Sequence, residues 1–287
     1  MKIDTLILSG GGPSGIAYFG IFKALFESKI INEDLDGIQE IITTSIGILS
    51  SFTLLLKMPI NIGLSIATGY DMKSYVNTDN IRVDDILIDH GIFETNGIYD
   101  LMKSILKNYT KKSDISLMEL YEITQIQLTV KVFNVTKKQL EYISYKTDPE
   151  LSILTLARMT TAIPLVFKPV KYNGYLYVDG GLRGHFPIEK CMSKNYLGIF
   201  IMGGSFPRNS EVLKLFPILE FIYSLMINQD QVVYDVQDNK VDPRIIYVTV
   251  DYGLNFDMSI EDKHKIIEEA YQITSRHIKK YLEKDTT

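Results

Sequence analysis

The feature that most constrains the fold is a glycine-rich loop near the N-terminus, between a short apolar stretch and an apolar helical pattern. Residues 5–8 (Thr-Leu-Ile-Leu) have the branched, apolar character of a buried strand. Gly10, Gly11 and Gly12 follow, and residues 16–28 show a helical pattern that is apolar on most sides. Glycines allow positive φ and close approach of the backbone, and a helix start leaves N–H groups without internal partners. The stretch therefore predicts a cradle for negative charge.

Three kinds of anion site use such a loop, and a turn without chemistry is the fourth interpretation. Gly10, Gly12 and Gly15 have the spacing of a dinucleotide-binding loop, which is weak evidence alone. A phosphate loop of nucleotide hydrolases ends in Gly-Lys-Ser/Thr, whereas residues 13–15 are Pro-Ser-Gly. The third kind is an oxyanion hole, where the N–H groups stabilise charge that develops during acyl transfer.

A second buried strand over residues 38–44 decides against dinucleotide binding. In a dinucleotide-binding fold this strand ends in an acidic residue, whereas here the chain reads Thr43-Thr44-Ser45. Ser45 stands at a sharp turn into an apolar helix, with Gly47 two positions later, which is the shape of a nucleophile elbow. The elbow normally reads Gly-x-Ser-x-Gly, and Thr43 replaces its first glycine. A serine at such a turn is also a common helix cap, so the motif alone leaves both interpretations open.

The rest of the chain alternates strand and helix patterns. The clearest hairpin joins residues 167–172 to 175–179 through Asn173-Gly174, and Asp179 ends its second strand as a candidate functional carboxylate or an ordinary turn residue. This order of elements predicts one α/β domain over residues 1–287, with a helical insertion at about 61–122. The remaining predicted elements are paired strands at 127–135 and 139–145, strands at 197–202 and 244–250, and helices at 71–77, 98–109, 150–161 and 259–282, the last with Ser259 and Asp262 in capping-box register.

Composition excludes several classes of protein. The net charge of −5 argues against a nucleic-acid binder, which carries a basic face. Cys191 is the one cysteine, so an internal disulfide framework and a cysteine-based zinc site are excluded, and a reducing compartment is favoured. No signal peptide is evident, and polar residues interrupt the apolar region 41–70, which favours a buried helix over a membrane span. Residues 211–228 are apolar on nearly every side, which predicts core packing or else a surface for a partner or bilayer.

Taken in order, these motifs resemble the patatin-like phospholipases, a family of lipid acyl hydrolases, from Leu6 to about Ile201. The family's pattern is a strand, a Gly-Gly-Gly oxyanion loop, a helix, a Gly-x-Ser-x-Gly elbow and a distant Asp-Gly-Gly or Asp-Gly-Ala. The corresponding stretches are residues 10–15, 43–47 and 179–181, and residues 157–167 are also similar to the segment before the family's aspartate. Each motif alone is weak, but four in order are specific.

The resemblance implies a three-layer α/β/α sandwich with a mostly parallel central sheet, and a Ser–Asp dyad without histidine. In that scheme Ser45 is the nucleophile and Asp179 the general base. Gly10, Gly11 and Gly12 form the oxyanion hole, with the N–H groups of Gly11 and Gly12 as donors. The elbow is framed by Thr43 and Gly47. Of the four histidines, His185 lies nearest to Asp179 in the sequence and is the reserve base.

The same resemblance implies the partners. The chemistry needs no metal or cofactor. The substrate is a phospholipid or another acyl-ester lipid, and we expect a cytoplasmic protein that meets a membrane surface peripherally without spanning it. The residues do not indicate the oligomeric state.

Two departures from the family's pattern keep an alternative open. The family usually has Arg or Lys where Ser14 stands, and Gly where Thr43 stands. A catalytically silent relative that binds lipid or a protein partner is therefore the alternative function. For the elbow itself we expect Ser45 at positive φ, with the Thr43 hydroxyl bonded to a nearby backbone carbonyl.

Overall fold

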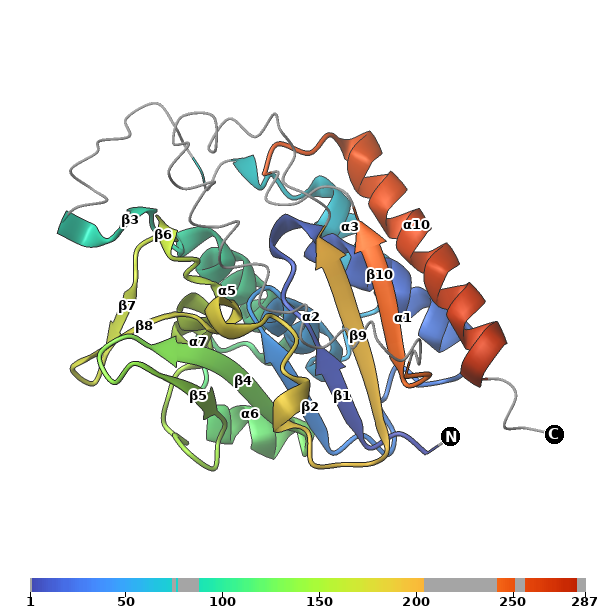
Figure 1. The fold of residues 1–287 in the computed structure, drawn as a ribbon, viewed down its shortest axis with the longest axis horizontal. Helices are drawn as coiled ribbons and strands as arrows, with labels where there is room; N and C mark the ends of the chain where they lie inside the picture. The colour runs from blue at the N-terminus through green and yellow to red at the C-terminus, as the bar shows by residue number, and fades with distance from the viewer. Residues whose placement is uncertain (1, 74–75, 77–87, 204–241, 251–255, 283–287) are drawn as a thin grey trace, which may run out of the picture.

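The computed structural model describes residues 2–73, 76, 88–203, 242–250 and 256–282. It is a mixed α/β fold in which helices lie on both sides of a sheet whose central strands are parallel (Figure 1). The predicted fold class is thus confirmed. Residues 61–122, predicted as a helical insertion, hold most of α3 together with β3, α5 and part of α6.

The sheet has the strand order β10-β9-β1-β2-β4-β8-β7, and β5 also pairs with β4. Strands β10, β9, β1, β2 and β4 run parallel, whereas β5 and β8 are antiparallel to β4. A separate parallel pair joins β3 to β6. The strands are β1 (Thr5–Leu8), β2 (Glu40–Thr44), β3 (Gly91–Phe93), β4 (Gln127–Asn134), β5 (Gln139–Ile143), β6 (Leu165–Phe167), β7 (Val170–Tyr172), β8 (Tyr175–Asp179), β9 (Tyr196–Gly203) and β10 (Ile245–Val250).

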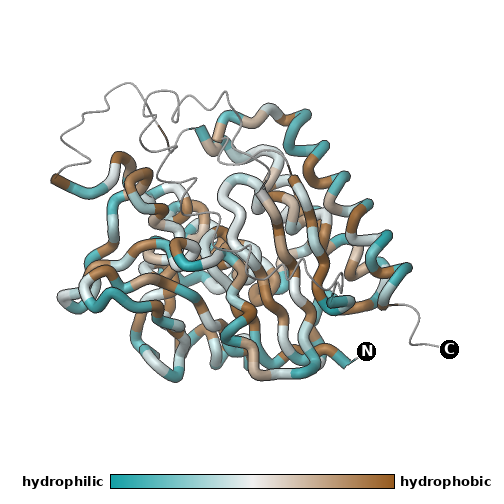
Figure 2. The backbone as a smooth tube through the Cα atoms, in the orientation of Figure 1, coloured by the Kyte–Doolittle hydropathy of each residue, from teal (hydrophilic) through white to brown (hydrophobic). Residues whose placement is uncertain are grey.

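Side chains along the central strands alternate between two hydrophobic layers, as the pleat of a strand requires. Leu6 and Leu8 of β1 belong to the large core, whereas Ile7 packs with Phe186 and Phe200 in a smaller cluster. Both faces of these strands are therefore buried, which explains their nearly continuous apolar runs. Figure 2 shows the hydrophobic central strands beside α10, which alternates between hydrophilic and hydrophobic residues.

Two helices at opposite ends of the chain, α1 and α10, pack directly on each other (Figure 1). Gly20 allows this approach, because a Cβ at that position would lie 2.0 Å from the backbone oxygen of Ile267. The described helices are η1 (Gly12–Ile16), α1 (Ala17–Glu27), α2 (Gly47–Leu55), α3 (Ile60–Gly69), α5 (Asn96–Thr110), α6 (Leu117–Thr124), α7 (Ile153–Thr161), η3 (Gly180–Arg183), η4 (Ile188–Lys190), α10 (Ile260–His277) and η6 (Ile278–Leu282).

Local signals in the sequence located several boundaries. Asn173 and Gly174 have φ values of 47° and 80°, as a primed hairpin turn requires. At the start of α10, Ser259 and Asp262 form the predicted capping box. Both predictions are confirmed because each depends only on residues a few positions apart.

Other boundaries differ from the prediction. The stretch 167–172 is not one strand: β6 ends at Phe167 and pairs with β3, whereas β7 begins at Val170 and pairs with β8. Pro169 lies between them and has no N–H to donate to a ladder. Helix α7 begins at Ile153 rather than at 150, because the Ser152 side chain caps it. The short strand β3 and the helix α3 were not predicted.

Two predicted segments fall outside the described residues, either partly (71–77) or wholly (211–228). Among the helices that the structure describes, none is both long enough and apolar enough to cross a membrane.

Candidate active site

The site forms where β2 and β8 meet end to end alongside β4. Strand β5 covers one side of β4 from Val130 to Asn134, so β2 and β8 must both lie on the other side. Thr44, the last residue of β2, pairs with Lys131, and Asp179, the last residue of β8, pairs with the adjacent Val132. Because β2 and β8 run in opposite directions, their final residues point at each other, and the next residue after β2 is Ser45.

Ser45 occupies a strained turn between β2 and α2. Its φ is 52°, which is the left-handed region expected for an elbow residue. The Ser45 hydroxyl donates a hydrogen bond of 2.6 Å to Asp179 Oδ2, and the Ser45 N–H donates one of 2.8 Å to Thr160 Oγ1. The serine is thus held at both its backbone and its side chain.

Asp179 is a buried carboxyl group with an unusual acidity. Burial raises its pKa to about 6, although hydrogen bonds from the Ser45 hydroxyl and the Gly181 N–H, and the charges of His185 and Lys131, oppose the rise. The Gly181 N–H donates to Oδ1 at 2.7 Å, so each carboxylate oxygen has a donor. The result is a carboxyl group whose protonation changes near neutral pH.

The three glycines of the predicted oxyanion loop have different roles. The Gly10 N–H donates to the carbonyl of His185 at 2.8 Å and is therefore already used. A Cβ on Gly10 would lie 3.0 Å from the Ser45 Cβ, so glycine lets the loop approach the serine. Gly12 has a φ of 52°. Within the described part of the chain, the N–H groups of Gly11 and Gly12 donate to no protein acceptor.

The glycine loop is anchored on two sides by Ser9. The Ile201 N–H of β9 donates to Ser9 Oγ at 2.9 Å, and the Ser9 hydroxyl donates to the carbonyl of Gly10. From α1, the Tyr18 hydroxyl donates to the Ser9 carbonyl at 2.7 Å. The loop is therefore fixed before any ligand arrives, which is what preorganised donors require.

The residue that departs from the family's elbow, Thr43, lies fully buried below Ser45. Its hydroxyl has no hydrogen-bond partner among the described residues, so the expected bond to a backbone carbonyl is wrong. A Cβ on Gly47 would lie 2.2 Å from Thr43 Oγ1 and 2.7 Å from the Ser9 carbonyl, and only glycine fits there. The Ser14 hydroxyl is likewise buried without a partner in the described chain.

Thr160 of α7 was not singled out from the sequence, yet it contacts the elbow directly. Its Oγ1 accepts the Ser45 N–H and donates its own proton to the carbonyl of Lys131 at 2.8 Å. The Thr160 hydroxyl thus both accepts and donates a hydrogen bond, and it links the elbow to β4. A threonine in a helix gives no local signal for this contact, because the partner lies 115 residues away.

Lys131 of β4 was also not singled out, although a lysine inside an apolar strand pattern is a usable signal. Its side chain is only 1% exposed, and its Nζ donates to the carbonyls of Arg183 and Gly184 and to Glu189 Oε1, at 2.6–2.9 Å. All three donors of the ammonium are satisfied, as burial of a charge requires. Lys131 therefore secures the segment that follows Asp179.

The rings of three histidines lie within hydrogen-bonding distance of backbone carbonyls. His185 Nε2 is 3.1 Å from the carbonyl of Ile201, and its ring packs against Phe200. The Ser45 hydroxyl bonds to Asp179 and not to His185. The rings of His264 and His277 meet the carbonyls of Ile260 and Pro243.

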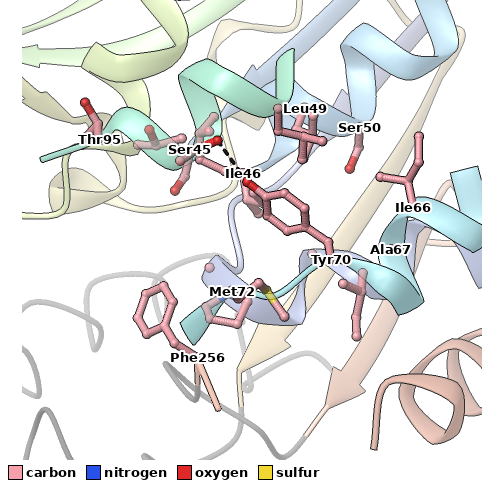
Figure 3. Close-up of a pocket in the computed structure, with 18 of the residues that line it drawn as sticks. Ser45, Ile46, Leu49, Ser50, Ile66, Ala67, Tyr70, Met72, Thr95 and Phe256 are labelled. Atoms are coloured by element: carbon pink, nitrogen blue, oxygen red, sulfur yellow. Dashed lines mark hydrogen bonds between the residues drawn. The ribbon is translucent and has the colours of Figure 1, made fainter. Parts of the chain in front are cut away.

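An apolar cavity of about 1030 Å³, including its opening to solvent, begins at Ser45 (Figure 3). In this view Ser45, Ile46 and Leu49 lie on one side, Met72 and Phe256 on the other, and the Tyr70 ring between them. Its further lining includes Gly12, Phe19, Ile66, Ile98, Leu101, Ile105, Ile163 and Phe167. Among the residues with described positions, no cluster of three metal-ligating side chains is present.

A protein-family model and two viral proteins are similar in sequence to this chain. The model of the patatin-like phospholipase family matches residues 6–192. The chain is 31% identical over 186 residues to the "Probable lipid hydrolase 463L" of Invertebrate iridescent virus 6, covering 64% of this chain and 62% of the relative. It is 24% identical over 187 residues to the "Uncharacterized protein R571" of Acanthamoeba polyphaga mimivirus, covering 65% and 61%. The chain thus spans less than two thirds of the length of these relatives.

Solved structures share the fold at low sequence identity. VipD from Legionella pneumophila superposes with a TM-score of 0.64 at 18% identity, covering 98% of this chain and 67% of VipD. A chain of the heterodimeric ExoU–SpcU complex from Pseudomonas aeruginosa superposes with a TM-score of 0.57 at 17% identity, covering 98% and 52%.

The contact between Thr160 and Ser45 predicts a strong effect of Thr160→Val. The variant leaves the Ser45 N–H without its buried partner and removes one of the two hydroxyl donors to the Lys131 carbonyl, which costs about 1–3 kcal/mol. If half of that loss falls on the elbow, the rate of Ser45 phosphonylation by a fluorophosphonate drops about two- to twelvefold. Thr160→Ser keeps the hydroxyl and is expected to retain the rate. Equal rates for Thr160→Val and wild type would show that this bond does not position Ser45.

The unpaired Thr43 hydroxyl predicts that Thr43→Gly is nearly neutral for stability. Glycine costs about 0.5–1 kcal/mol in a strand and loses a buried methyl group worth about 0.8 kcal/mol, but it removes a buried unpaired hydroxyl that costs about 1–3 kcal/mol. The matched control is Thr44→Gly, because the Thr44 hydroxyl donates to the Lys131 carbonyl. Urea unfolding should show a clear loss only for the control, and equal losses would contradict the argument.

The raised pKa of Asp179 predicts that Asp179→Asn stabilises the fold above pH 6. Well below its ordinary pKa of 3.8 the carboxyl is protonated in both states, and between 3.8 and about 6 mainly the folded chain holds the proton. Wild-type stability therefore falls over this range as pH rises, by up to about 3 kcal/mol at about 1.4 kcal/mol per pKa unit. Urea unfolding at pH 4 and pH 8 should give a much larger gain for the variant at pH 8 than at pH 4. A gain of the same size at both values would rule out this origin.

Proposed function

The chain belongs to the patatin-like phospholipase family, and we propose that it hydrolyses fatty-acyl esters of lipids, with Ser45 as nucleophile and Asp179 as general base. The observation that carries the proposal is the 2.6 Å hydrogen bond from the Ser45 hydroxyl to a buried carboxyl group, beside an apolar cavity. A nucleophile within hydrogen-bond reach of its base is the arrangement that covalent acyl transfer needs.

In the first half-reaction, Ser45 Oγ attacks the acyl carbon while Asp179 Oδ2 takes the hydroxyl proton. Negative charge develops on the former carbonyl oxygen, which the N–H groups of Gly11 and Gly12 stabilise, each donor contributing about 3 kcal/mol. The tetrahedral intermediate then collapses: the bond to the alcohol breaks, and Asp179 returns the proton to the leaving alkoxide. The product of this half-reaction is an acyl-Ser45 ester.

In the second half-reaction, water replaces Ser45 as the nucleophile. Asp179 takes a proton from the water as it attacks the acyl carbon, and the same glycine loop holds the oxyanion. Collapse breaks the bond to Ser45 Oγ, which recovers its proton from Asp179. The fatty acid leaves, and the free enzyme is restored. The apolar side chains that line the cavity, among them Phe19 and Ile105, would hold the acyl chain during both half-reactions.

The acidity of Asp179 suits this role. A carboxylate with a pKa near 4 is a weak base toward a serine hydroxyl, whereas burial raises the pKa of Asp179 to about 6. A base works best when its pKa lies close to the working pH while most of it remains ionised. At pH 7 or above, Asp179 is both ionised and strengthened as a base.

A catalytically silent protein that binds lipid is the second candidate function. It is favoured by the buried unpaired hydroxyls of Thr43 and Ser14, which stand where the family usually has Gly and a cation. The cavity would then hold an acyl chain without cleaving it. The two functions differ in one measurable property, which is the reactivity of Ser45.

The test is a fluorophosphonate probe on the purified protein, with turnover of a soluble nitrophenyl fatty-acid ester. We expect the wild type to be labelled, Ser45→Ala to be unlabelled, and Asp179→Asn to lose about 10²–10⁴-fold in kcat/KM. Because Asp179 must be ionised, wild-type kcat/KM should rise about tenfold per pH unit up to about 6 and then level. A folded wild type that neither reacts with the probe nor turns over the ester is the silent protein.

A further inference from the structure

Charged side chains gather at one edge of an otherwise apolar cavity. Among the described residues that line it, Glu94 is the one charged group. Glu94 meets two cations, Lys168 at 3.3 Å and Arg158 at 3.7 Å, and Lys168 also meets Asp89 at 2.8 Å. These four residues, two acids and two bases, are called the mouth quartet below.

The mouth quartet lies at the opening of the cavity and not at its base. The Glu94 side chain lines the cavity and is also 49% exposed, so it stands where the cavity meets solvent. The other three side chains are 28–43% exposed, which leaves each of them accessible to a ligand at the same edge.

The backbone around the mouth quartet is held by the β3–β6 pair. Asp89 precedes β3, Glu94 follows it, and Lys168 directly follows β6. Gly91 allows the two strands to approach, since a Cβ there would lie 2.4 Å from the carbonyl carbon of Phe167. Three of the charges thus flank a short ladder, and the fourth, Arg158, is on helix α7.

Helix α7 connects the mouth quartet to the nucleophile, because it carries both Arg158 and Thr160. Thr160 of α7 accepts the Ser45 N–H, and Thr161 lines the cavity. Arg158 precedes Thr161 by three positions and so lies on the same face of the helix, about 5 Å along its axis. Arg158 Nε also donates to Thr95 Oγ1, another residue of the cavity wall.

The position of the mouth quartet at the cavity opening suits a glycerophospholipid. In such a lipid the phosphate is joined to the scissile ester by a few covalent bonds of the glycerol, so its phosphate lies a short distance beyond the reacting carbonyl. With the acyl chain in the cavity and the carbonyl at Ser45, the headgroup leaves through the mouth. There Arg158 and Lys168 donate hydrogen bonds to its phosphate, and the carboxylates of Asp89 and Glu94 attract its positively charged nitrogen.

We propose that the mouth quartet recognises zwitterionic phospholipid headgroups, so that the substrate class is a phosphocholine or phosphoethanolamine lipid. The proposal rests on the function proposed above. Equal numbers of acids and bases favour a ligand that carries both charges, whereas an anionic headgroup would meet the two carboxylates and a neutral one would pair with neither set. Half-exposed ion pairs add little to stability, so replacing their contacts by contacts to a headgroup costs little free energy.

The test compares phosphatidylcholine, phosphatidylglycerol and diacylglycerol with identical acyl chains in neutral detergent micelles. Wild-type kcat/KM should be at least tenfold higher for phosphatidylcholine than for the other two. In Lys168→Gln, the ratio of kcat/KM for phosphatidylcholine to that for a soluble nitrophenyl ester should fall at least fivefold. Lys112→Gln is the matched control, because Lys112 pairs with Glu119 at 2.7 Å on an exposed surface outside the cavity, and it should leave the ratio unchanged.

Equal rates on the three lipids, or a fall for Lys168→Gln that is the same on the nitrophenyl ester, would overturn the headgroup site while leaving the dyad intact. If the wild type does not hydrolyse the nitrophenyl ester, the proposed hydrolysis is wrong, but the headgroup site can still be tested by binding. Calorimetry with monomeric dodecylphosphocholine should show at least fivefold weaker binding to Lys168→Gln than to Lys112→Gln. Equal affinities of the two variants would overturn the headgroup site.

Discussion

The geometry of the candidate site depends on the register of β4, which pairs with the ends of two opposed strands on one side. A parallel sheet by itself brings strand ends to a common edge, a full strand spacing apart. Here the antiparallel β8 continues the line of β2, and Thr44 and Asp179 pair with adjacent residues of β4. A shift of β8 by one residue would turn the Asp179 side chain to the opposite face. The backbone ladder therefore sets the 2.6 Å contact with Ser45 before any side chain adjusts.

That geometry carries a cost in stability that the surrounding residues offset. Ser45 in the left-handed region costs about 1–3 kcal/mol, and ionised Asp179 is buried against its preference. Thr160 holds the Ser45 N–H, and Lys131 holds the carbonyls that follow Asp179. The strain is thus concentrated at the point of proposed chemistry, and the bonds that maintain it come from β4 and α7, which lie in the core.

Sequence patterns located the features that depend on neighbours along the chain. The glycine loop, the turn at Ser45, the Asn173-Gly174 hairpin and the α10 capping box each involve residues a few positions apart, and the structure contains all of them. Features that depend on distant partners were missed. Strand β3 has only three residues and exists because β6 pairs with it, and Thr160 reaches Ser45 across 115 positions. The partner expected for Thr43 was wrong: its hydroxyl is buried without one and lies against Gly47, a contact that no local pattern indicates.

Lys131 connects the electrostatics of the site to its architecture. Burial alone would raise the pKa of Asp179 further, and a carboxyl group that stays protonated at neutral pH has no capacity to accept a proton. The hydrogen bonds from Ser45 and Gly181, and then the charges of His185 and Lys131, limit the rise to about 6, so the carboxyl is mostly ionised at pH 7. Lys131 is itself tolerated in the core because two carbonyls and the half-exposed Glu189 satisfy its ammonium, and Tyr142 donates to the same Glu189 oxygen. One buried cation thus fixes the segment after Asp179 and adds the last of the contributions that oppose the effect of burial on the pKa of that carboxyl group.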